Sequence, residues 1–212
     1  MQPNLTMKAR LQQLQRQLGV KADGVLGGQT LSAIERDLKL VAQPEPAAAL
    51  NGRIWPDDND AALRAFFGEP GEDNLVSFTL PYPMKLYTRD GQAVTRSRCH
   101  AKVKDSLCAV LEDIQRIYGK DWIEFHGLDV FGGIYNYRTM RRGTSLSRHS
   151  WGIAIDLNPD ENTMQTPWKA ERIGQPGWAT MPQEAIAVFE KHGWKSGAHA
   201  WGKDAMHFQA TR

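Results

Sequence analysis

The sequence contains only two cysteines among its 212 residues, Cys99 and Cys108. Two cysteines do not make a disulfide framework, so we expect both thiols to stay reduced. Neither is paired with a histidine, which argues against a cysteine-ligated zinc site. The sequence also lacks an apolar run of about 18 residues or more, the length that a membrane-spanning helix needs. We therefore expect no membrane insertion.

Three further features are missing. The start, Met1-Gln2-Pro3-Asn4-Leu5, has no basic residues followed by an apolar run, so we expect no secretory signal and synthesis in the cytoplasm. No phosphate-binding glycine loop is present, because Gly132-Gly133 is only a turn dipeptide. The formal net charge of +2 is too small to indicate a polyanionic partner, and we expect no nucleic-acid binding.

The ten residues from Ser147 to Asp156 carry the strongest signal that is present. His149 and Asp156 are seven positions apart. In one helix they would lie about 10 Å apart along the axis, whereas two zinc ligands must approach within roughly 4 Å. In one straight strand, an odd offset would put them on opposite faces. A bend at Gly152 would let both reach one ion, and residues 153–157 would then form a mostly buried strand.

A second cluster, Asp204-Ala205-Met206-His207, completes the set. His207 is the candidate third ligand, and Asp204 is the candidate general base. Together with His149 and Asp156, this is the inventory of a catalytic zinc site with one coordination position open. Each part alone has a simpler explanation: a hydrogen-bonded structural histidine, a strand-end carboxylate, or a chance Asp-x-x-His.

These residues also carry a family resemblance. The pattern Ser-x-His-x-x-Gly-x-Ala-x-Asp, followed by Asp-x-x-His-Phe, resembles the D-alanyl-D-alanine carboxypeptidase family of zinc peptidases, which includes phage L-alanyl-D-glutamate endopeptidases. The upstream segment 131–138 fits as well, and the resemblance covers roughly residues 75–212. Gln209 stands where many relatives have glutamate, which leaves a supporting role at that position open.

The resemblance implies roles for individual residues. It implies three zinc ligands, His149, Asp156 and His207, with Asp204 as the base. It implies that Arg138 holds the substrate carbonyl and the developing oxyanion. Ser147 resembles a supporting polar residue of the substrate site.

The N-terminal region carries a second motif. Leu-Gln-x-x-Leu, followed by Gly-Val-x-x-Asp-Gly-Val-x-Gly-x-x-Thr-x-x-Ala-Ile, resembles the peptidoglycan-binding helical module found beside many wall hydrolases. Leu26 and Gly28 depart from that pattern, where an aromatic residue and a proline are commoner. A generic helical hairpin used for packing is the alternative. We expect a wall-binding module at 1–42, a linker at 43–60 and a zinc peptidase domain at 61–212.

Periodicity predicts the main elements. The best helix spans 101–118 and ends at Gly119, and further helices are predicted at 61–67 and 183–192. Strands are predicted at 76–80 and 84–88, separated by two prolines. The expected fold class is α+β, in which a small antiparallel sheet with flanking helices carries the zinc site and a small all-α wall-binding module precedes it. Of the other histidines, His199 lies just before residues 201–204 and its role at the cleft stays open, and we expect structural or exposed positions for His100, His126 and His192.

The expected function is that of a zinc-dependent peptidoglycan peptidase. We expect an L-Ala–D-Glu endopeptidase acting as a phage endolysin, a monomer whose partner is bacterial peptidoglycan. It would be made in the host cytoplasm and would act on the periplasmic wall after release. The alternatives are a D-Ala-D-Ala carboxypeptidase, a non-catalytic wall-binding protein and a metal-bound signalling domain of the hedgehog type. Intact Asp204 and Arg138 argue against the non-catalytic alternative, and the N-terminal motif argues against the signalling domain.

Overall fold

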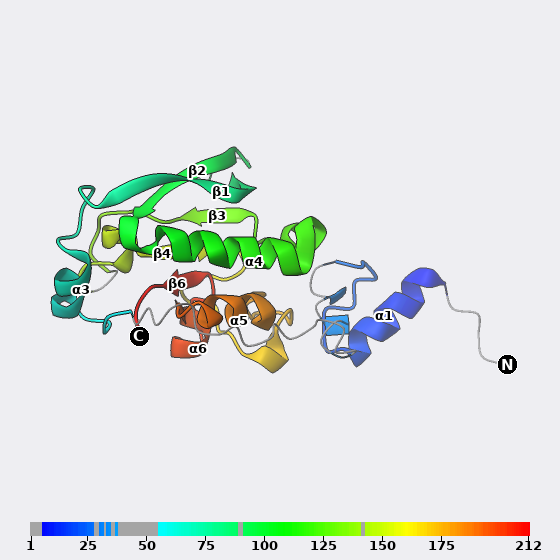
Figure 1. Cartoon of the computed structure of the whole chain (residues 1–212). Coiled ribbons are helices and arrows are strands. Elements are labelled where there is room, and N and C mark those ends of the chain that lie inside the picture. Colours follow the sequence, from blue (N-terminus) through cyan, green and yellow to red (C-terminus); the bar gives the residue numbers. More distant parts are fainter. Residues whose placement is uncertain are drawn as a thin grey trace.

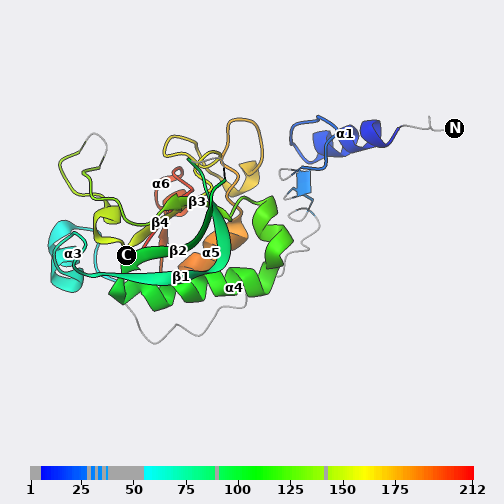
Figure 2. The same cartoon turned by 90° about the horizontal axis from the view of Figure 1, so that it is seen from above.

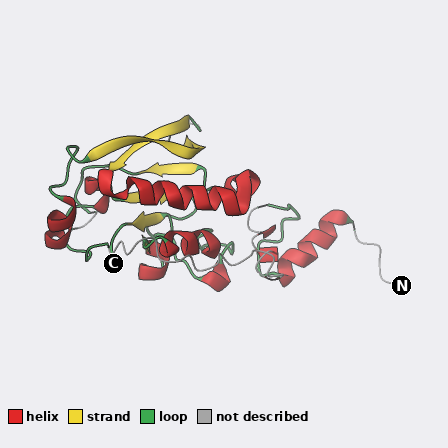
Figure 3. Cartoon of the chain, viewed as in Figure 1, coloured by secondary structure: helices red, strands yellow, loops and turns green. Residues whose placement is uncertain are grey.

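A mixed six-stranded sheet forms the centre of the protein. The computed structural model describes residues 6–27, 30, 31, 33, 34, 37, 55–88, 91–140 and 143–212. The strand order is β2-β1-β3-β4-β6-β5 (Figures 1 and 3). The strands are β1 (Leu75–Leu86), β2 (Ala93–His100), β3 (Val130–Gly133), β4 (Ala154–Leu157), β5 (Lys195–Ser196) and β6 (His207–Gln209).

Helices precede and connect these strands. They are α1 (Met7–Gln17), α3 (Asp60–Phe67), α4 (Ala101–Phe125), α5 (Gln183–Lys191) and α6 (Gly197–Trp201), with two short 3₁₀ helices, η1 (Arg148–Trp151) and η2 (Ala170–Arg172). The helices expected at 61–67 and 183–192 are confirmed as α3 and α5. Glycines with positive φ follow both: Gly68 at 85° and Gly193 at 80°.

The fold class is α+β with flanking helices, as expected, but the sheet is mixed and not purely antiparallel. Strands β1 and β3 pair in parallel, with Lys85 opposite Val130, whereas the other neighbours pair antiparallel. The long helix α4 lies between β2 and β3 in the chain. A crossover of that kind permits a parallel pair, whereas a tight turn joins only antiparallel neighbours.

The expectation of two strands around the prolines was also wrong, because a single strand, β1, continues through them. Pro81 and Pro83 fall inside the register shift between Thr79 and Met84 in the pairing with β2. A proline has no N–H to donate to a ladder, so it is tolerated at such an irregularity. The prolines therefore disrupt the pairing without ending the strand.

Helix α4 extends beyond its predicted end. Gly119 has the non-helical angles φ 77° and ψ 174°, so the helical geometry does break there as predicted. A further helical segment then runs to Phe125 and buries Ile123. Packing of that segment overrides the stop that the glycine indicates in the sequence.

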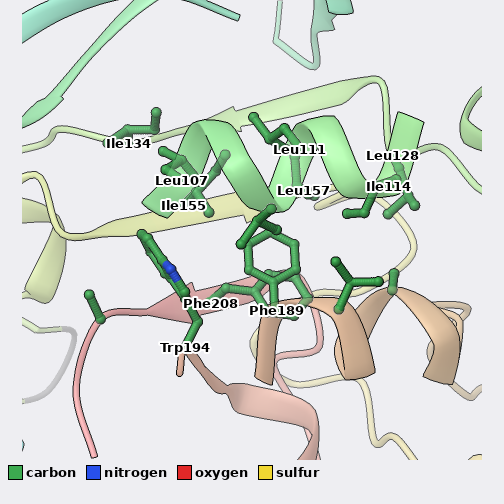
Figure 4. Packing of buried hydrophobic residues seen from close by; sticks show 14 of the residues in the cluster. Leu107, Leu111, Ile114, Leu128, Ile134, Ile155, Leu157, Phe189, Trp194 and Phe208 are labelled. Atoms are coloured by element: carbon green, nitrogen blue, oxygen red, sulfur yellow. The ribbon is translucent and has the colours of Figure 1, made fainter. Parts of the chain in front are cut away.

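The hydrophobic core lies between α4, α5 and the strands that carry the ligand candidates (Figure 4). Leu107 and Leu111 of α4 contribute to the same buried cluster as Ile155 of β4. The rings of Phe189 and Phe208 stack at a centroid distance of 3.8 Å, which joins α5 to β6. Burying each such side chain contributes about 1.5–3 kcal/mol. The core therefore holds β4 and β6 rigidly in register.

The N-terminal helix α1 lies beyond the C-terminal end of α4 (Figure 2). Its Gln15 is buried and donates to Asp23 Oδ1 at 2.9 Å and to Thr30 Oγ1 at 2.8 Å. The side-chain oxygen Oε1 of Gln15 accepts from the backbone N–H of Gly24 at 2.8 Å. The side chain of this one glutamine thus links α1 to the glycine-containing turn and to Thr30.

Most of the expected linker, up to residue 54, lies outside the described residues. Its last part packs against the sheet-containing region. Trp55 is buried, and its ring stacks on Phe67 at 6.2 Å. The backbone N–H of Arg212 donates to Pro56 O at 3.1 Å. This end of the expected linker is therefore packed against α3 and the C-terminal residue.

Within the described residues, no helix combines the length and the apolar character needed to cross a membrane. Cys99 lies on β2 and Cys108 on α4, and both thiols are free, as expected.

Candidate metal centre

His149 lies on η1, which begins after Ser147 and ends at Gly152. Ser147 Oγ accepts from the backbone N–H of His149 at 3.4 Å. Gly152 adopts φ 68°, and a Cβ atom there would lie 2.6 Å from Leu75 Cδ2. Only glycine fits this left-handed, crowded position. The bend that the sequence required is therefore a single 3₁₀ turn closed by Gly152.

Asp156 and His207 are direct cross-strand partners. They face each other in the antiparallel pairing of β4 and β6. Opposite residues of such a pair project to the same face of the sheet, which brings their side chains together. On the other side of β4, Gly132 of β3 makes room for the aspartate: a Cβ there would lie 2.8 Å from Asp156 Cβ.

The three candidate ligands form a compact triangle. His207 Nδ1 lies 3.0 Å from Asp156 Oδ1, His149 Nε2 lies 3.3 Å from the same oxygen, and the two histidine nitrogens are 3.3 Å apart. Three ligands of a tetrahedral zinc ion with bonds of about 2.0–2.1 Å are separated by roughly 3.3–3.4 Å. The donor set and its spacing therefore fit a zinc ion.

The ring nitrogen of His149 that points away from the triangle has a defined partner. His149 Nδ1 lies 2.7 Å from the backbone oxygen of Ile134. A carbonyl oxygen only accepts, so Nδ1 carries the proton and Nε2 presents its lone pair to the triangle. This tautomer is the one that metal ligation requires.

The charges of the triangle favour a cation. Burial alone would raise the pKa of Asp156, but His149 and His207 outweigh it and hold that pKa well below its usual range. Burial lowers the pKa of His207, while its hydrogen bond to Asp156 and the nearby carboxylates raise it overall. The carboxylate is thus ionised and surrounded by nitrogen donors.

Asp204 lies beside the triangle in a strained turn. Its φ is 56°, which is uncommon for a residue other than glycine. The tightness of this turn is visible at Gly197, where an added Cβ would collide with the backbone oxygen of Asp204. Asp204 Oδ1 is buried and has no hydrogen-bond partner. Burial raises the pKa of this carboxyl, against the opposing effect of His207. A strained, unsatisfied carboxyl of this kind is typical of a functional site.

The triangle opens into a cleft of about 480 Å³. The remaining predicted site residues, Arg138 and Ser147, both line it. The backbone of Arg138 is fixed to the histidine turn, because its N–H donates to Ser150 Oγ at 3.0 Å and its oxygen accepts from the Ser147 N–H at 2.9 Å. Other lining residues are Met140, Met164, Trp201 and Lys203. The structure therefore places all six predicted site residues at one cleft.

Two side chains at this cleft were not assigned from the sequence. Gln209 Oε1 lies 3.0 Å from His207 Nε2, so the role left open for this residue is a contact to a candidate ligand. Its position two residues after His207 on a strand was the available signal, because i and i+2 share a face. Asp58 accepts from Gln209 Nε2 at 2.8 Å. No sequence pattern indicated Asp58, which comes from the expected linker.

His199, whose role the sequence left open, is not among the residues that line the cleft. His199 is partly exposed on α6, and its Nδ1 lies 2.7 Å from Glu190 Oε1. His192 lies at the C-terminal end of α5, the structural position expected for it. His100 and His126 are both buried.

Comparison with known proteins points to the same segment. Residues 141–210 match the model of the D-alanyl-D-alanine carboxypeptidase family. The matched segment contains all three members of the triangle and Asp204. A match to this family of zinc peptidases implies a zinc metallopeptidase, and the triangle is close enough to hold a metal ion. No curated protein and no solved structure gave a significant match to the chain.

Proposed function

We propose that this chain is a zinc-dependent peptidoglycan peptidase that cleaves the L-Ala–D-Glu bond of the stem peptide. The observation that carries the proposal is the triangle of His149, Asp156 and His207 beside the unpartnered oxygen of Asp204. Two neutral nitrogens and one carboxylate match a catalytic zinc site, which keeps a position open for water or substrate.

The proposed chemistry divides between the metal and the chain. A zinc ion held by the triangle would supply a Lewis acid that polarises a carbonyl and lowers the pKa of water. Asp204 accepts a proton from the attacking water at its free Oδ1 and later delivers it to the leaving amine. The raised pKa of this buried carboxyl suits a group that must both take and release a proton.

Arg138 is the proposed electrophilic partner. Its backbone is tied to the turn that carries His149, so its position is coupled to that of the metal site. A cation there stabilises the oxyanion that forms on the scissile carbonyl. Removing such a donor typically lowers the rate about 10²–10³-fold.

The residues that line the cleft are suited to bind a peptide that carries carboxylates. Trp201 and Met140 are exposed apolar side chains at the cleft, where they can contact the backbone and small side chains of a stem peptide. Lys203 and Arg138 line the same cleft and can pair with an acidic residue such as D-Glu. Ser147 is proposed as a polar contact to the substrate.

A D-Ala-D-Ala carboxypeptidase is the second candidate, because residues 141–210 match a family that is named for that activity. Both reactions use the same metal chemistry and differ in the bond that enters the cleft. We expect digestion of purified peptidoglycan, followed by mass spectrometry, to yield fragments with a new D-Glu amino terminus. Release of free D-Ala would instead establish the carboxypeptidase. The absence of any product, with zinc bound, would contradict both.

The N-terminal region is proposed to bind the wall, with residues 1–42 as the binding module, 43–60 as the linker and 61–212 as the peptidase domain. Tethering would raise the local concentration of the enzyme at its substrate. Because Trp55 packs against Phe67, a test fragment should begin before residue 55. We expect such a fragment to cleave soluble wall peptides at the full-length rate and to sediment less with insoluble wall. Equal sedimentation of both forms would contradict a wall-binding module.

The biological setting is part of the proposal. We infer a phage endolysin, a monomer made in the host cytoplasm that reaches the periplasmic wall after release. Rapid lysis of cells whose outer membrane has been permeabilised, by the purified protein, is the expected result.

A further inference from the structure

We propose that Asp58 is a positioning residue of the metal centre, which selects the tautomer of His207 through Gln209. The inference rests on the proposed zinc site but not on the identity of the bond that is cleaved. A hydrogen-bond chain links the segment before α3 to the candidate ligand His207.

The chain has three members. His207 Nε2 lies 3.0 Å from Gln209 Oε1, and Gln209 Nε2 donates to Asp58 Oδ2 at 2.8 Å. The amide nitrogen of Gln209 also donates to Thr211 Oγ1 at 2.6 Å. Both His207 and Gln209 are buried, so water cannot easily replace these contacts.

The direction of each hydrogen bond follows from the chemistry of Asp58. An ionised carboxylate only accepts, so the Gln209 side chain must turn its NH₂ group toward Asp58 and its oxygen toward His207. An amide oxygen also only accepts, so the proton of the His207 ring must reside on Nε2. Nδ1, which lies 3.0 Å from Asp156 Oδ1, is then the nitrogen that can give its lone pair to a metal ion bound beside that carboxylate.

Asp58 is itself held by the second ligand segment. Arg148, the residue before His149, bonds Asp58 Oδ1 through Nε at 2.5 Å and Asp60 Oδ1 through Nη1 at 3.0 Å. One carboxylate therefore contacts a neighbour of each histidine ligand: Arg148 beside His149 and Gln209 near His207. The acid from the segment before α3 fixes the two halves of the site relative to each other.

An acidic residue next to Asp58 provides a matched control. Asp57 pairs with Arg212 at 2.7 Å, and both side chains of this pair are largely exposed. It belongs to the same segment, but its carboxylate bonds Arg212 instead of Gln209 or Arg148. A change at Asp57 therefore removes one negative charge from the segment and leaves the relay, the hydrogen-bond chain from Asp58 through Gln209 to His207, unchanged.

The test uses Asp58→Asn in the full-length protein. The NH₂ group of an asparagine can donate to Gln209, which allows that amide to flip and to donate to His207 Nε2, so that the ring proton moves to Nδ1. We expect ¹⁵N NMR of the zinc-loaded protein to show the His207 ring proton on Nε2 in the wild type and to lose that signal in Asp58→Asn. Zinc affinity should fall about 10–100-fold, the usual effect of losing a partner of a metal ligand. Asp57→Asn should change neither quantity.

The double variant Asp58→Asn with Gln209→Glu separates this relay from a general loss of structure. The new carboxylate at 209 accepts from both sides, which restores the Nε2–H tautomer. We expect zinc affinity to recover toward the wild-type value. If Asp58→Asn does not fold, Gln209→Leu tests the same relay while leaving the Arg148 pair intact. Wild-type tautomer and affinity in whichever of Asp58→Asn and Gln209→Leu folds would overturn the proposal, whether or not the protein cleaves peptidoglycan.

Discussion

The protein contains two buried histidine–aspartate pairs that look alike by distance. His207 Nδ1 lies 3.0 Å from Asp156 Oδ1, and His192 Nε2 lies 2.9 Å from Asp113 Oδ2. Each histidine is 8% exposed, and the aspartate side chains are 16% and 20% exposed. Burial and distance alone therefore do not separate a candidate metal centre from a structural ion pair.

The surroundings of the carboxylates separate them. Asp113 also bonds Arg116 at 2.6 Å and Lys191 at 3.3 Å, so its charge is already balanced by permanent cations. Asp156 contacts the rings of two histidines, which can be neutral nitrogen donors. A divalent cation is favoured where an anion meets neutral donors and disfavoured beside two fixed positive charges.

Removing the histidine of each pair should give the largest contrast. We expect His207→Ala to lose a metal ligand, so that zinc affinity falls by more than the roughly 100-fold limit of outer-shell changes and hydrolysis is abolished. His192→Ala should keep one zinc per chain and lose about 1.5–3 kcal/mol of stability, the contribution of a charge-assisted hydrogen bond. Metal analysis and denaturant unfolding of both variants test this. One tightly bound zinc in His207→Ala would contradict the assignment.

A second prediction concerns Asp204, the carboxylate that lies beside the pair of Asp156 and His207. Asp204→Asn keeps the shape of the side chain and removes its basicity. We expect near-normal zinc content and a kcat lower by about 10²–10⁴-fold, the usual contribution of a general acid–base group. Zinc content and turnover of a wall peptide are the measurements. Loss of zinc would make Asp204 a ligand, and full turnover would place the base elsewhere.

The sequence predicted much of the local structure at the cleft. The separation of His149 and Asp156 required a bend, and the structure has one at Gly152. The strand expected at 153–157 is confirmed as β4. Both inferences succeeded because they depend on spacing within one segment. The ligand and catalytic roles of these residues stay predictions.

What the sequence could not predict depends on distant segments. The pairing that puts His207 opposite Asp156 joins residues 51 positions apart, and short strands such as β4 and β6 carry no register signal. The contact of Gln209 with Asp58 spans 151 positions. The sequence predicts a linker that includes Asp58, because the stretch that ends there contains many alanines and prolines. Only the fold reveals that the Asp58 carboxylate accepts a hydrogen bond from Gln209 beside the candidate metal centre.

His126, a buried histidine outside both pairs, allows a test of how stability depends on pH. His126 packs against the ring of Trp122 at 4.3 Å, and burial lowers its pKa to about 4. Its ordinary pKa is about 6.5, so the unfolded chain binds the proton first as the pH falls. We expect stability to drop by about 3 kcal/mol between pH 6.5 and pH 4 and to change no further from this group below pH 4. Unfolding curves of His126→Gln should lack that share of the slope, and an identical slope would contradict it.

The smallest expected effect concerns the structural pair of His192 and Asp113. Burial raises the pKa of Asp113, but the basic side chains around it outweigh burial and lower the pKa from 3.8 to about 2. Because the folded-state pKa is the lower one, the stabilisation is present above pH 3.8 and is lost as the pH falls through 2. A shift of this size corresponds to about 2 kcal/mol, since each pKa unit is about 1.4 kcal/mol. We expect wild-type stability to decline over that window and Asp113→Asn to start lower at pH 5 and to decline less. Asp113 does not line the cleft, so Asp113→Asn should change stability while zinc content stays at one per chain. A loss of zinc in Asp113→Asn would show that the two histidine–aspartate pairs are coupled through α5 and β6, and the distinction between them would fail.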